Sequence, residues 1–241
     1  MERQEYIKYI IEAFKDNGLA DVIDEDKADK LYDLYSILVE TNKHTNLTAI
    51  TEEKDVILKH FIDSASVCEC FAENSTVIDV GCGAGFPSFP LAILRPDLSI
   101  TAIDSTGKKV NYVNSTAAKL GLTNIAATCT RAEDFAKEHR EEFDACTSRA
   151  VARLNILSEL CIPFIKLGGR FVAMKSDKGA EEFDEAKKGI ALLGCDLQSK
   201  REIEFKLEDN SIQREIYVFA KQRKTPSTYP RNYSQITKKP L

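Results

Sequence analysis

Three glycines and an acidic residue have the spacing of a binding site for a nucleotide-like ligand. A β-branched run is followed by glycines at alternate positions, Gly81, Gly83 and Gly85. Glycine lets the backbone turn sharply and approach a ligand closely, so this segment is typical of the turn between a strand and a helix. Asp104 ends the next apolar run, where a carboxylate can accept hydrogen bonds from both ribose hydroxyls.

The spacing of the glycines favours S-adenosylmethionine over a dinucleotide. A dinucleotide fingerprint has its third glycine one position later, where this chain has Phe86. S-adenosylmethionine has no pyrophosphate for the turn to cradle, so alternate glycines followed by an acid suit it. The alternatives are a nicotinamide or flavin site and a glycine-rich turn that binds no ligand.

The elements that must position these residues are strands that alternate with helices. Runs rich in β-branched residues predict strands at 76–81, 98–104, 124–129, 143–148 and 169–175. Each of these runs is followed by a segment whose apolar residues recur at helical spacing, which predicts helices at 88–95, 107–120, 131–140, 153–166 and 179–193. Parallel strands joined by right-handed helical crossovers form a doubly wound sheet, so this order predicts an α/β fold.

The alternation breaks near the carboxyl end. Two strand-like runs, 196–207 and 213–221, flank the polar turn Glu208–Asn210 and predict an antiparallel hairpin. Five parallel strands closed by a terminal antiparallel hairpin are the layout of the class I S-adenosylmethionine-dependent methyltransferase fold, a Rossmann-like doubly wound sheet.

The first part of the chain is predicted to be all-helical. Apolar residues at helical spacing occur in 2–16, in 26–42 and from Thr51 to about Phe71, with a polar turn at Lys43–Asn46. We therefore divide the chain into an N-terminal helical extension (1–72), an S-adenosylmethionine-binding methyltransferase domain (73–222) and a basic C-terminal tail (223–241).

The charge of the chain is unevenly distributed. Residues 221–241 contain six Lys and Arg residues and no acidic residue, so the rest is more acidic than the formal net charge of −5 suggests. Such asymmetry predicts a basic segment that contacts nucleic-acid phosphates, although a merely solubilising tail is the alternative. Pro226, Pro230 and Pro240 disfavour a helix, so we expect this segment to run extended.

The cysteines and the lengths of the apolar runs argue against a zinc protein, a membrane-spanning protein and a secreted protein. Most of the seven cysteines lie in apolar runs, and Cys68-x-Cys70 is too tight for a zinc site, so we expect reduced packing residues and no metal. No apolar run approaches the roughly 20 residues of a membrane span, and the charged start lacks a secretory core. We expect a cytoplasmic protein that does not engage a membrane.

Ligands of open α/β sheets lie at the carboxyl ends of the strands, which directs attention to two further positions. Ala132 and Glu133 follow the third strand, where they could contact an adenine edge or simply start a charged helix. Arg149 ends the fourth strand. Its guanidinium could hold the cofactor or a phosphate, pair with guanine O6, or form a structural salt bridge.

Along nearly its whole length the chain resembles the bacterial 16S ribosomal RNA guanine-N7 methyltransferases, once called glucose-inhibited division protein B. The resemblance rests on segments in matching order: Asn46-Leu47-Thr48-Ala49-Ile50, Lys59-His60-Phe61-Ile62-Asp63-Ser64, Asp79-Val80-Gly81, Gly83-Ala84-Gly85-Phe86-Pro87, Asp104-Ser105, Arg131-Ala132-Glu133, Ser148-Arg149-Ala150-Val151-Ala152 and Lys238-Lys239-Pro240-Leu241.

The resemblance implies methylation of N7 of a guanine in 16S rRNA, at position 527 of the 530 loop. It implies that the cofactor is bound at Gly81, Phe86, Ala132, Glu133 and Arg149. Asp104 and Ser105 match the family's segment after the second strand. The substrate would be 16S rRNA as free RNA, an assembly intermediate or the small ribosomal subunit, and we expect a monomer.

Basic and polar residues near these segments are candidates for RNA contact. They are Asn46, His60, Arg153, Lys175, Arg231, Lys238 and Lys239. The chain departs from the family at two places. It has Thr41-Asn42 and no Trp before Asn46, and Lys175-Ser176 with Lys178-Gly179 in place of a lysine–glycine pair, which leaves open which lysine faces the pocket.

The sequence lacks the motifs used to methylate adenine amines and cytosine carbon, which agrees with methylation of guanine N7. Methylation of an exocyclic adenine amine uses an Asn/Asp-Pro-Pro-aromatic motif, and none occurs after the fourth predicted strand. Cytosine-carbon methylation uses a Pro-Cys nucleophile, and Cys146 and Cys161 lack that arrangement. Guanine N7 has an available lone pair, so transfer needs alignment and no general base. We therefore assign no catalytic residue. A small-molecule methyltransferase and a non-catalytic ribosome-assembly module are the alternatives.

Overall fold

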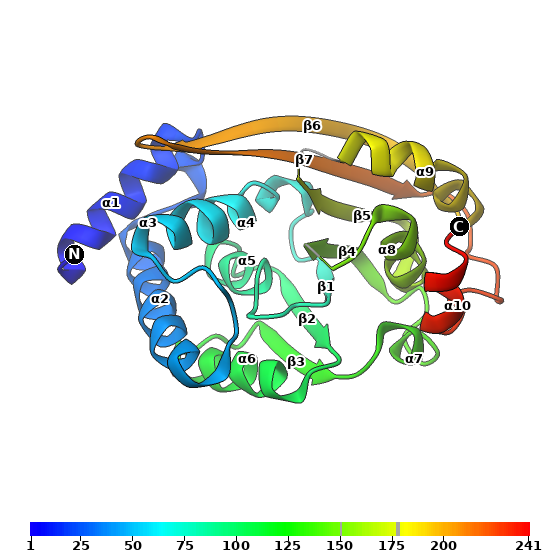
Figure 1. Ribbon diagram of the computed structural model, residues 1–241, viewed down its shortest axis with the longest axis horizontal. Helices are drawn as coiled ribbons and strands as arrows, with labels where there is room; N and C mark the ends of the chain where they lie inside the picture. Colours follow the sequence, from blue (N-terminus) through cyan, green and yellow to red (C-terminus); the bar gives the residue numbers. More distant parts are fainter. Residues whose placement is uncertain (150, 177–178) are drawn as a thin grey trace.

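A computed structural model describes residues 1–149, 151–176 and 179–241 of the chain (Figure 1). Within these residues one sheet of seven strands has the order β3-β2-β1-β4-β5-β7-β6. The strands are β1 (Thr76–Val80), β2 (Ser99–Asp104), β3 (Ile125–Cys129), β4 (Phe143–Arg149), β5 (Ile165–Lys175), β6 (Cys195–Leu207) and β7 (Asn210–Lys221).

The pairing of the strands confirms the predicted class I methyltransferase fold. Strands β1 to β5 are parallel, and β7 pairs antiparallel with both β5 and β6. One boundary was wrong, because β5 begins at Ile165 and the predicted helix 153–166 ends earlier. Pro163 lies at the start of a short 3₁₀ helix, η4 (Ile162–Phe164), and proline lacks the N–H that a continuing helix would use.

Helices cover both faces of the sheet. They are α5 (Ser88–Leu94), α6 (Gly107–Lys119), α7 (Ala132–Phe135), α8 (Leu154–Cys161) and α9 (Gly179–Leu192). Alternate strand residues point to opposite faces, so Val77 belongs to one hydrophobic cluster and Ile78 to the other. The predicted helix 131–140 is shorter than expected, because regular α-helix ends at Phe135.

The N-terminal helices share the first cluster with the sheet. Phe14, Leu31 and Phe61 pack in the same cluster as Phe89 and Ile100. The elements are α1 (Arg3–Asp16), η1 (Ala20–Val22), α2 (Glu25–Thr45), α3 (Glu53–Val56), a π-helical segment (Ile57–Ile62), α4 (Asp63–Ala65) and η3 (Cys68–Cys70). The domain division at residue 72 therefore stays a prediction, since no separate core marks it.

Two local predictions in this region were wrong. Helix α2 continues to Thr45, so the expected turn at 43–46 is reduced to Asn46, whose φ of 49° ends the helix. The helix expected from Thr51 to Phe71 is instead broken into short pieces around the π segment.

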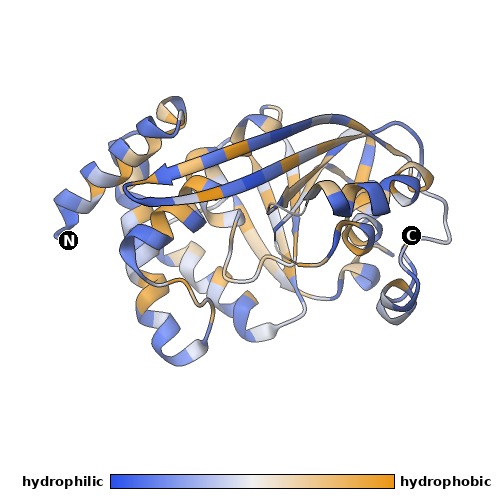
Figure 2. Ribbon diagram, turned by 45° about the horizontal axis from the view of Figure 1, so that its top comes forward, coloured by the Kyte–Doolittle hydropathy of each residue, from blue (hydrophilic) through white to orange (hydrophobic). Residues whose placement is uncertain are grey.

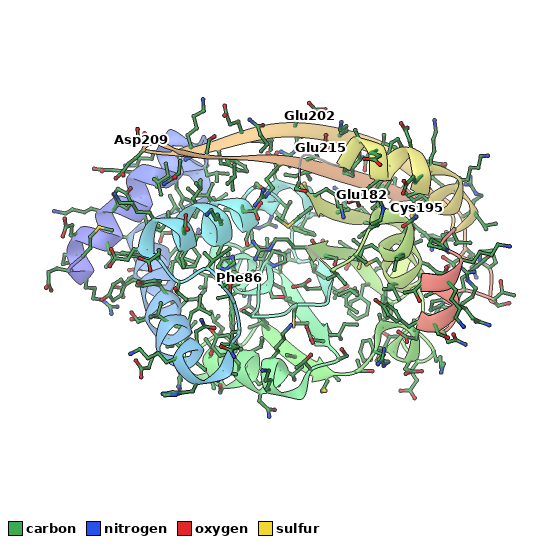
Figure 3. All side chains as sticks on the ribbon, in the orientation of Figure 1. Phe86, Glu182, Cys195, Glu202, Asp209 and Glu215 are labelled. Carbon is green, nitrogen blue, oxygen red and sulfur yellow. The ribbon has the colours of Figure 1, made fainter. Side chains whose placement is uncertain are left out.

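The β6–β7 hairpin reaches from α9 to the N-terminal helices (Figure 1), and hydrophobic residues are interspersed with hydrophilic ones along both strands (Figure 2). Near its tip, marked by Asp209 in Figure 3, the Tyr9 hydroxyl donates to Glu208 Oε1 at 2.8 Å. Asn17 and Lys206 exchange two hydrogen bonds of 2.8 Å. The turn is one residue shorter than predicted, because β7 already begins at Asn210. The hairpin thereby ties the N-terminal helices to the sheet.

The C-terminal segment contradicts the expectation of an extended tail. Residues Tyr233–Lys238 form helix α10, and the Asn232 side chain accepts a hydrogen bond from Gln235 N at its start. Pro230 and Pro240 flank this helix and do not interrupt it. Ile236 is fully buried in the second hydrophobic cluster, so the tail packs against the body.

A buried ion pair anchors this tail. The Glu159 carboxylate on α8 is fully buried and accepts hydrogen bonds from Arg231 Nε at 2.9 Å and Nη2 at 2.6 Å. The Arg231 backbone N–H adds a third bond of 2.8 Å to the same carboxylate. Arg231 therefore stabilises the fold, and its predicted RNA contact stays untested.

Crossing a bilayer takes roughly 20 apolar residues in one helix, and no helix in the described ranges meets that requirement. The same ranges contain no cluster of His, Cys, Asp and Glu suited to a metal ion. All seven cysteines are free thiols, and Cys129 is exposed, against the expectation that they all pack inside.

We expect the Arg231→Ala variant to lose about 3–5 kcal/mol of unfolding free energy, because the fully buried Glu159 carboxylate would lose its partner. Urea unfolding of the wild type and the variant measures this loss. The control is Lys238→Ala on the same segment, whose exposed side chain should change stability by less than about 0.5 kcal/mol. Equal losses in the two variants would contradict the anchoring role.

Candidate functional site

A cavity of about 500 Å³ lies at the carboxyl ends of β1 to β4, within the range of small-molecule sites. Most of the predicted site residues line it: His60, Gly81, Gly83, Phe86, Asp104, Ser105, Ala132, Glu133 and Arg149. The predicted residues outside its lining are Asn46, Gly85, Arg153, Lys175, Arg231, Lys238 and Lys239. The structure thus gathers the predicted cofactor residues except Gly85, and His60 alone of the RNA candidates.

Gly83 and Gly85 have different structural roles in the glycine turn. At Gly83 a Cβ atom would meet only the Gly81 carbonyl, at 4.0 Å, so the backbone borders open space in the cavity wall. At Gly85, whose φ is +82°, a Cβ atom would collide with the Phe89 ring on α5. Gly83 therefore leaves room for a ligand, and Gly85 permits close packing of the turn against the helix.

Asp104 joins the end of β2 to the glycine turn. Its Oδ2 accepts a hydrogen bond from Gly83 N at 3.1 Å, and its Oδ1 accepts one from Thr106 N at 2.8 Å. The Lys109 ammonium lies 3.9 Å from Oδ2. These contacts hold a carboxylate in the cavity wall with lone pairs left over for hydroxyl donors.

Asp79 is a buried carboxylate beneath the turn to which the sequence analysis gave no role. Its Oδ2 accepts a hydrogen bond from the Ser88 hydroxyl at the start of α5. Its Oδ1 has no partner among the described residues. Burial raises the pKa of Asp79 to about 6. The signal in the sequence was a single acid within an otherwise apolar strand.

The β3 side of the cavity carries Glu133 in the first turn of α7. Its side chain is largely buried, and Arg131 Nη1 lies 4.0 Å from Glu133 Oε1. The Arg131 guanidinium is also 6.0 Å from the centre of the Tyr233 ring, which comes from α10 and lines the cavity. Sequence reasoning missed Tyr233, because nothing in its neighbourhood along the chain links the tail to the third strand.

Arg149 at the end of β4 forms the structural salt bridge that was one of its alternatives. Its Nη1 donates to Asp63 Oδ2 at 3.0 Å and to the Lys59 carbonyl at 2.8 Å. Its guanidinium also lies 5.5 Å from the centre of the Phe86 ring. Asp63 is buried, and its Oδ1 accepts a further hydrogen bond from Arg214 Nε on β7 at 2.8 Å.

The π segment presents His60 to the cavity, stacked on Phe86, which Figure 3 labels, with ring centres 4.1 Å apart. Arg149 Nη2 lies 3.0 Å from His60 Nδ1, and a guanidinium can only donate, so Nδ1 must accept. The proton then sits on Nε2, which donates to the Thr48 hydroxyl at 3.2 Å. Burial and the Arg149 charge lower the pKa of His60 to about 3.

Asn42 shapes the segment that follows α2. Its Oδ1 accepts hydrogen bonds from Leu47 N at 2.6 Å and Thr48 N at 3.0 Å, and its Nδ2 donates to the Thr48 carbonyl at 2.9 Å. Leu47 and Thr48 therefore line the cavity, whereas Asn46 is exposed outside its lining.

The other residues predicted to contact RNA differ in burial and in whether their charged groups are paired with a carboxylate. Lys175 is buried and bonds to Glu182 at 2.7 Å and to the Ala152 carbonyl at 2.9 Å. Arg153 pairs with Glu185 at 2.8 Å on the surface. Lys238 and Lys239 are exposed. The neighbouring candidate Lys178 lies outside the described residues. RNA binding by these side chains stays a prediction.

Known proteins resemble the chain at the levels of sequence and fold. The family rRNA small subunit methyltransferase G matches residues 27–213. Ribosomal RNA small subunit methyltransferase G of Staphylococcus aureus (strain JH9) is 42% identical over 238 residues, 98% of each chain. The Clostridium perfringens protein of that name is 44% identical over 221 residues, 90% of this chain and 92% of its own. M. jannaschii TYW2, solved in complex with AdoMet, shares the fold with a TM-score of 0.52 at 16% identity, covering 66% of this chain and 74% of its own.

The low pKa of His60 predicts a pH-dependent contribution to stability. The folded state disfavours the imidazolium, so this contribution is complete above the unfolded pKa near 6.5 and is lost as pH falls toward about 3, by up to about 1.4 kcal/mol per pH unit. His60→Gln removes the titration and keeps a hydrogen-bond acceptor for Arg149.

Urea unfolding between pH 7 and 4.5 should therefore show a shallower loss of stability for His60→Gln than for the wild type. The difference between the two proteins is the quantity to compare, because the raised pKa of Asp79 acts in the opposite direction over part of this range. Parallel curves would contradict a buried neutral His60. His44→Gln, at an exposed histidine, is the matched control.

Proposed function

Because this chain belongs to the rRNA small subunit methyltransferase G family, we propose that it methylates N7 of a guanine in 16S rRNA, at position 527 of the 530 loop, using S-adenosylmethionine. The observation that carries the proposal is the cavity in which the open backbone at Gly83 meets the Asp104 carboxylate.

The residues present fit this cofactor. The open space beside Gly83 has room for the amino-acid part, and the Asp104 carboxylate suits two ribose hydroxyls. Ala132 and Glu133 border the cavity after β3, where they would contact the adenine. Gly81 and Phe86 also line the cavity and would contact the bound cofactor. When bound, S-adenosylmethionine supplies an electrophilic methyl group.

His60 in the cavity wall and Asp63 behind it are both poorly suited to act as a general base, which supports transfer without one. His60 Nδ1 already accepts from Arg149, and the low pKa of the ring makes it a poor base. The Asp63 carboxylate is occupied by Arg149 and Arg214. Guanine N7 needs no deprotonation, so the residues have only to align the acceptor with the methyl group, an effect worth up to about 7–11 kcal/mol.

Nucleophilic catalysis by cysteine finds no support either. Cys82 borders the cavity, but burial and the nearby carboxylates of Asp79 and Asp104 raise the pKa of its thiol. Cys146 and Cys161 are fully buried in the second hydrophobic cluster. A protonated thiol is a weak nucleophile, so a covalent enzyme–base intermediate is not part of the proposal.

The acceptor must reach the cavity in an unpaired state. The major-groove edge that carries N7 is deep and narrow in A-form RNA, so side chains reach it only when the base is looped out. We propose that exposed polar and basic residues outside the cavity lining hold the surrounding RNA: Asn46, Arg153, Lys238 and Lys239. His60, in the cavity wall, would face the inserted base.

The proposal is tested by mass spectrometry of 16S rRNA from a strain that lacks the gene, which should lose one N7-methylguanine. Purified protein with S-adenosylmethionine should restore the methyl group on naked rRNA, an assembly intermediate or the small subunit, and comparing these three identifies the substrate. Transfer to small acceptors but not to RNA would favour a small-molecule enzyme. Absence of cofactor binding would favour an assembly module.

We expect Asp104→Asn to weaken S-adenosylmethionine binding by about 10- to 100-fold, because charge-assisted hydrogen bonds to the ribose become neutral ones. Isothermal titration calorimetry measures the affinity, and melting temperatures of the two proteins show whether the turn stays folded. Asp209→Asn, at the exposed hairpin tip, is the matched control and should bind as the wild type does. An unchanged affinity in a folded Asp104→Asn protein would contradict the ribose assignment.

We expect Cys82, Cys129, Cys146, Cys161 and Cys195 each to tolerate replacement by alanine with single-turnover methyl transfer within about ten-fold of the wild type, since N7 requires no covalent intermediate. The buried positions should lose some stability, which urea unfolding records separately. A loss of several orders of magnitude in transfer rate for one folded variant would overturn the proposed mechanism.

A further inference from the structure

We propose that helix α10 is part of the cofactor site and that the Tyr233 ring stacks on the adenine of S-adenosylmethionine. This inference rests on the proposed function and adds a residue from the C-terminal tail to it. Tyr233 borders the cavity, and 40% of its surface is exposed. A large aromatic side chain that is half open beside a cavity presents a face on which a flat ring can stack.

The charges beside Tyr233 place it at the adenine end of the cavity. Its ring centre is 6.0 Å from the guanidinium of Arg131, the residue directly before Ala132 and Glu133. Arg131, Ala132 and Glu133 follow β3, whereas Arg149 is the last residue of β4, and β2 and β1 separate these two strands in the sheet. The stacked pair of His60 and Phe86 lies beside Arg149. Tyr233 therefore belongs to the side of the cavity away from the His60–Arg149 group.

The position of α10 is set by buried contacts that do not involve the cavity. Ile236 is fully buried, Arg231 bonds to the buried Glu159, and the carboxyl-terminal Leu241 packs closely over Gly189 on α9. Arg231 Nη2 also donates to the Lys239 carbonyl at 3.0 Å, which links both ends of the helix. Tyr233 is therefore held in place before a ligand binds, so little ordering is needed when the adenine enters.

The physical interaction is the one that aromatic side chains make with nucleobases. A base has a polarisable face, and offset stacking on a tyrosine ring favours binding irrespective of hydrogen bonds. The Arg131 guanidinium near the same ring adds a positive charge beside the stacked pair. Ala132 and Leu160 line the same cavity and offer apolar contacts.

The first experiment titrates S-adenosylhomocysteine and 5′-methylthioadenosine, which lacks the amino-acid part, into the wild type and three variants. We expect Tyr233→Ala to weaken both ligands equally, by about 3- to 10-fold, because both carry the adenine. Tyr233→Phe keeps the ring and should bind within about two-fold of the wild type. Gln235→Ala, at an exposed position on the same helix, is the matched control and should bind both ligands as the wild type does.

The second experiment uses the absence of tryptophan from the chain. Tyr233→Trp provides a single tryptophan, excited selectively over the tyrosines, whose emission should be quenched by 5′-methylthioadenosine, whereas Gln235→Trp, at an exposed position on the same helix, should show no change. Normal ligand affinity in Tyr233→Ala, or a raised Michaelis constant for RNA with unchanged cofactor affinity, would overturn the inference alone. A wild type that binds neither adenosyl ligand would overturn the proposed function as well.

Discussion

The buried carboxylate of Asp63 is the interaction on which the rest of the site depends. Its two oxygens accept hydrogen bonds from Arg149 at 3.0 Å and from Arg214 at 2.8 Å, and only 1% of its surface is exposed. A charge this deeply buried must be paired, so the three chain segments that supply these groups are constrained to meet. They are the N-terminal helices, which the sequence analysis assigned to the helical extension, and the end of β4 and the terminal hairpin, which it assigned to the methyltransferase domain.

This constraint extends into the cavity through Arg149. The same guanidinium donates to His60, fixes which ring nitrogen carries the proton, and lies over the Phe86 ring that stacks on His60. His60 in turn bonds to Thr48, so the segment after α2 becomes one wall of the cavity. In the proposed mechanism, which depends on alignment, these buried hydrogen bonds would supply the rigid wall.

Basic residues of this chain lie in two different environments, buried ion pairs and the exposed surface, which the sequence alone does not distinguish. Arg231 and Lys175 bond to largely buried glutamates and hold the tail and the end of β5 in place. Lys238 and Lys239 remain exposed and can attract phosphates. The distinction depends on burial. A basic group in a buried ion pair cannot leave its partner without a large energetic cost, whereas a solvent-exposed lysine can bind a phosphate.

The sequence alone determined the alternating strands and helices, the glycine turn and the place of Asp104 at the end of β2. Strand periodicity, the backbone freedom of glycine and the right-handed crossover between parallel strands all act over short stretches of chain, so a local sequence pattern is enough to predict these features. The same reasoning placed most of the residues predicted to bind the cofactor at one edge of the sheet, where they line the cavity. Only the tertiary structure decided that the tail forms a helix, that Tyr233 enters the cavity, and that Asp63 joins Arg149 to Arg214. These contacts join residues far apart in the chain, and their strength comes from burial, which no local pattern encodes.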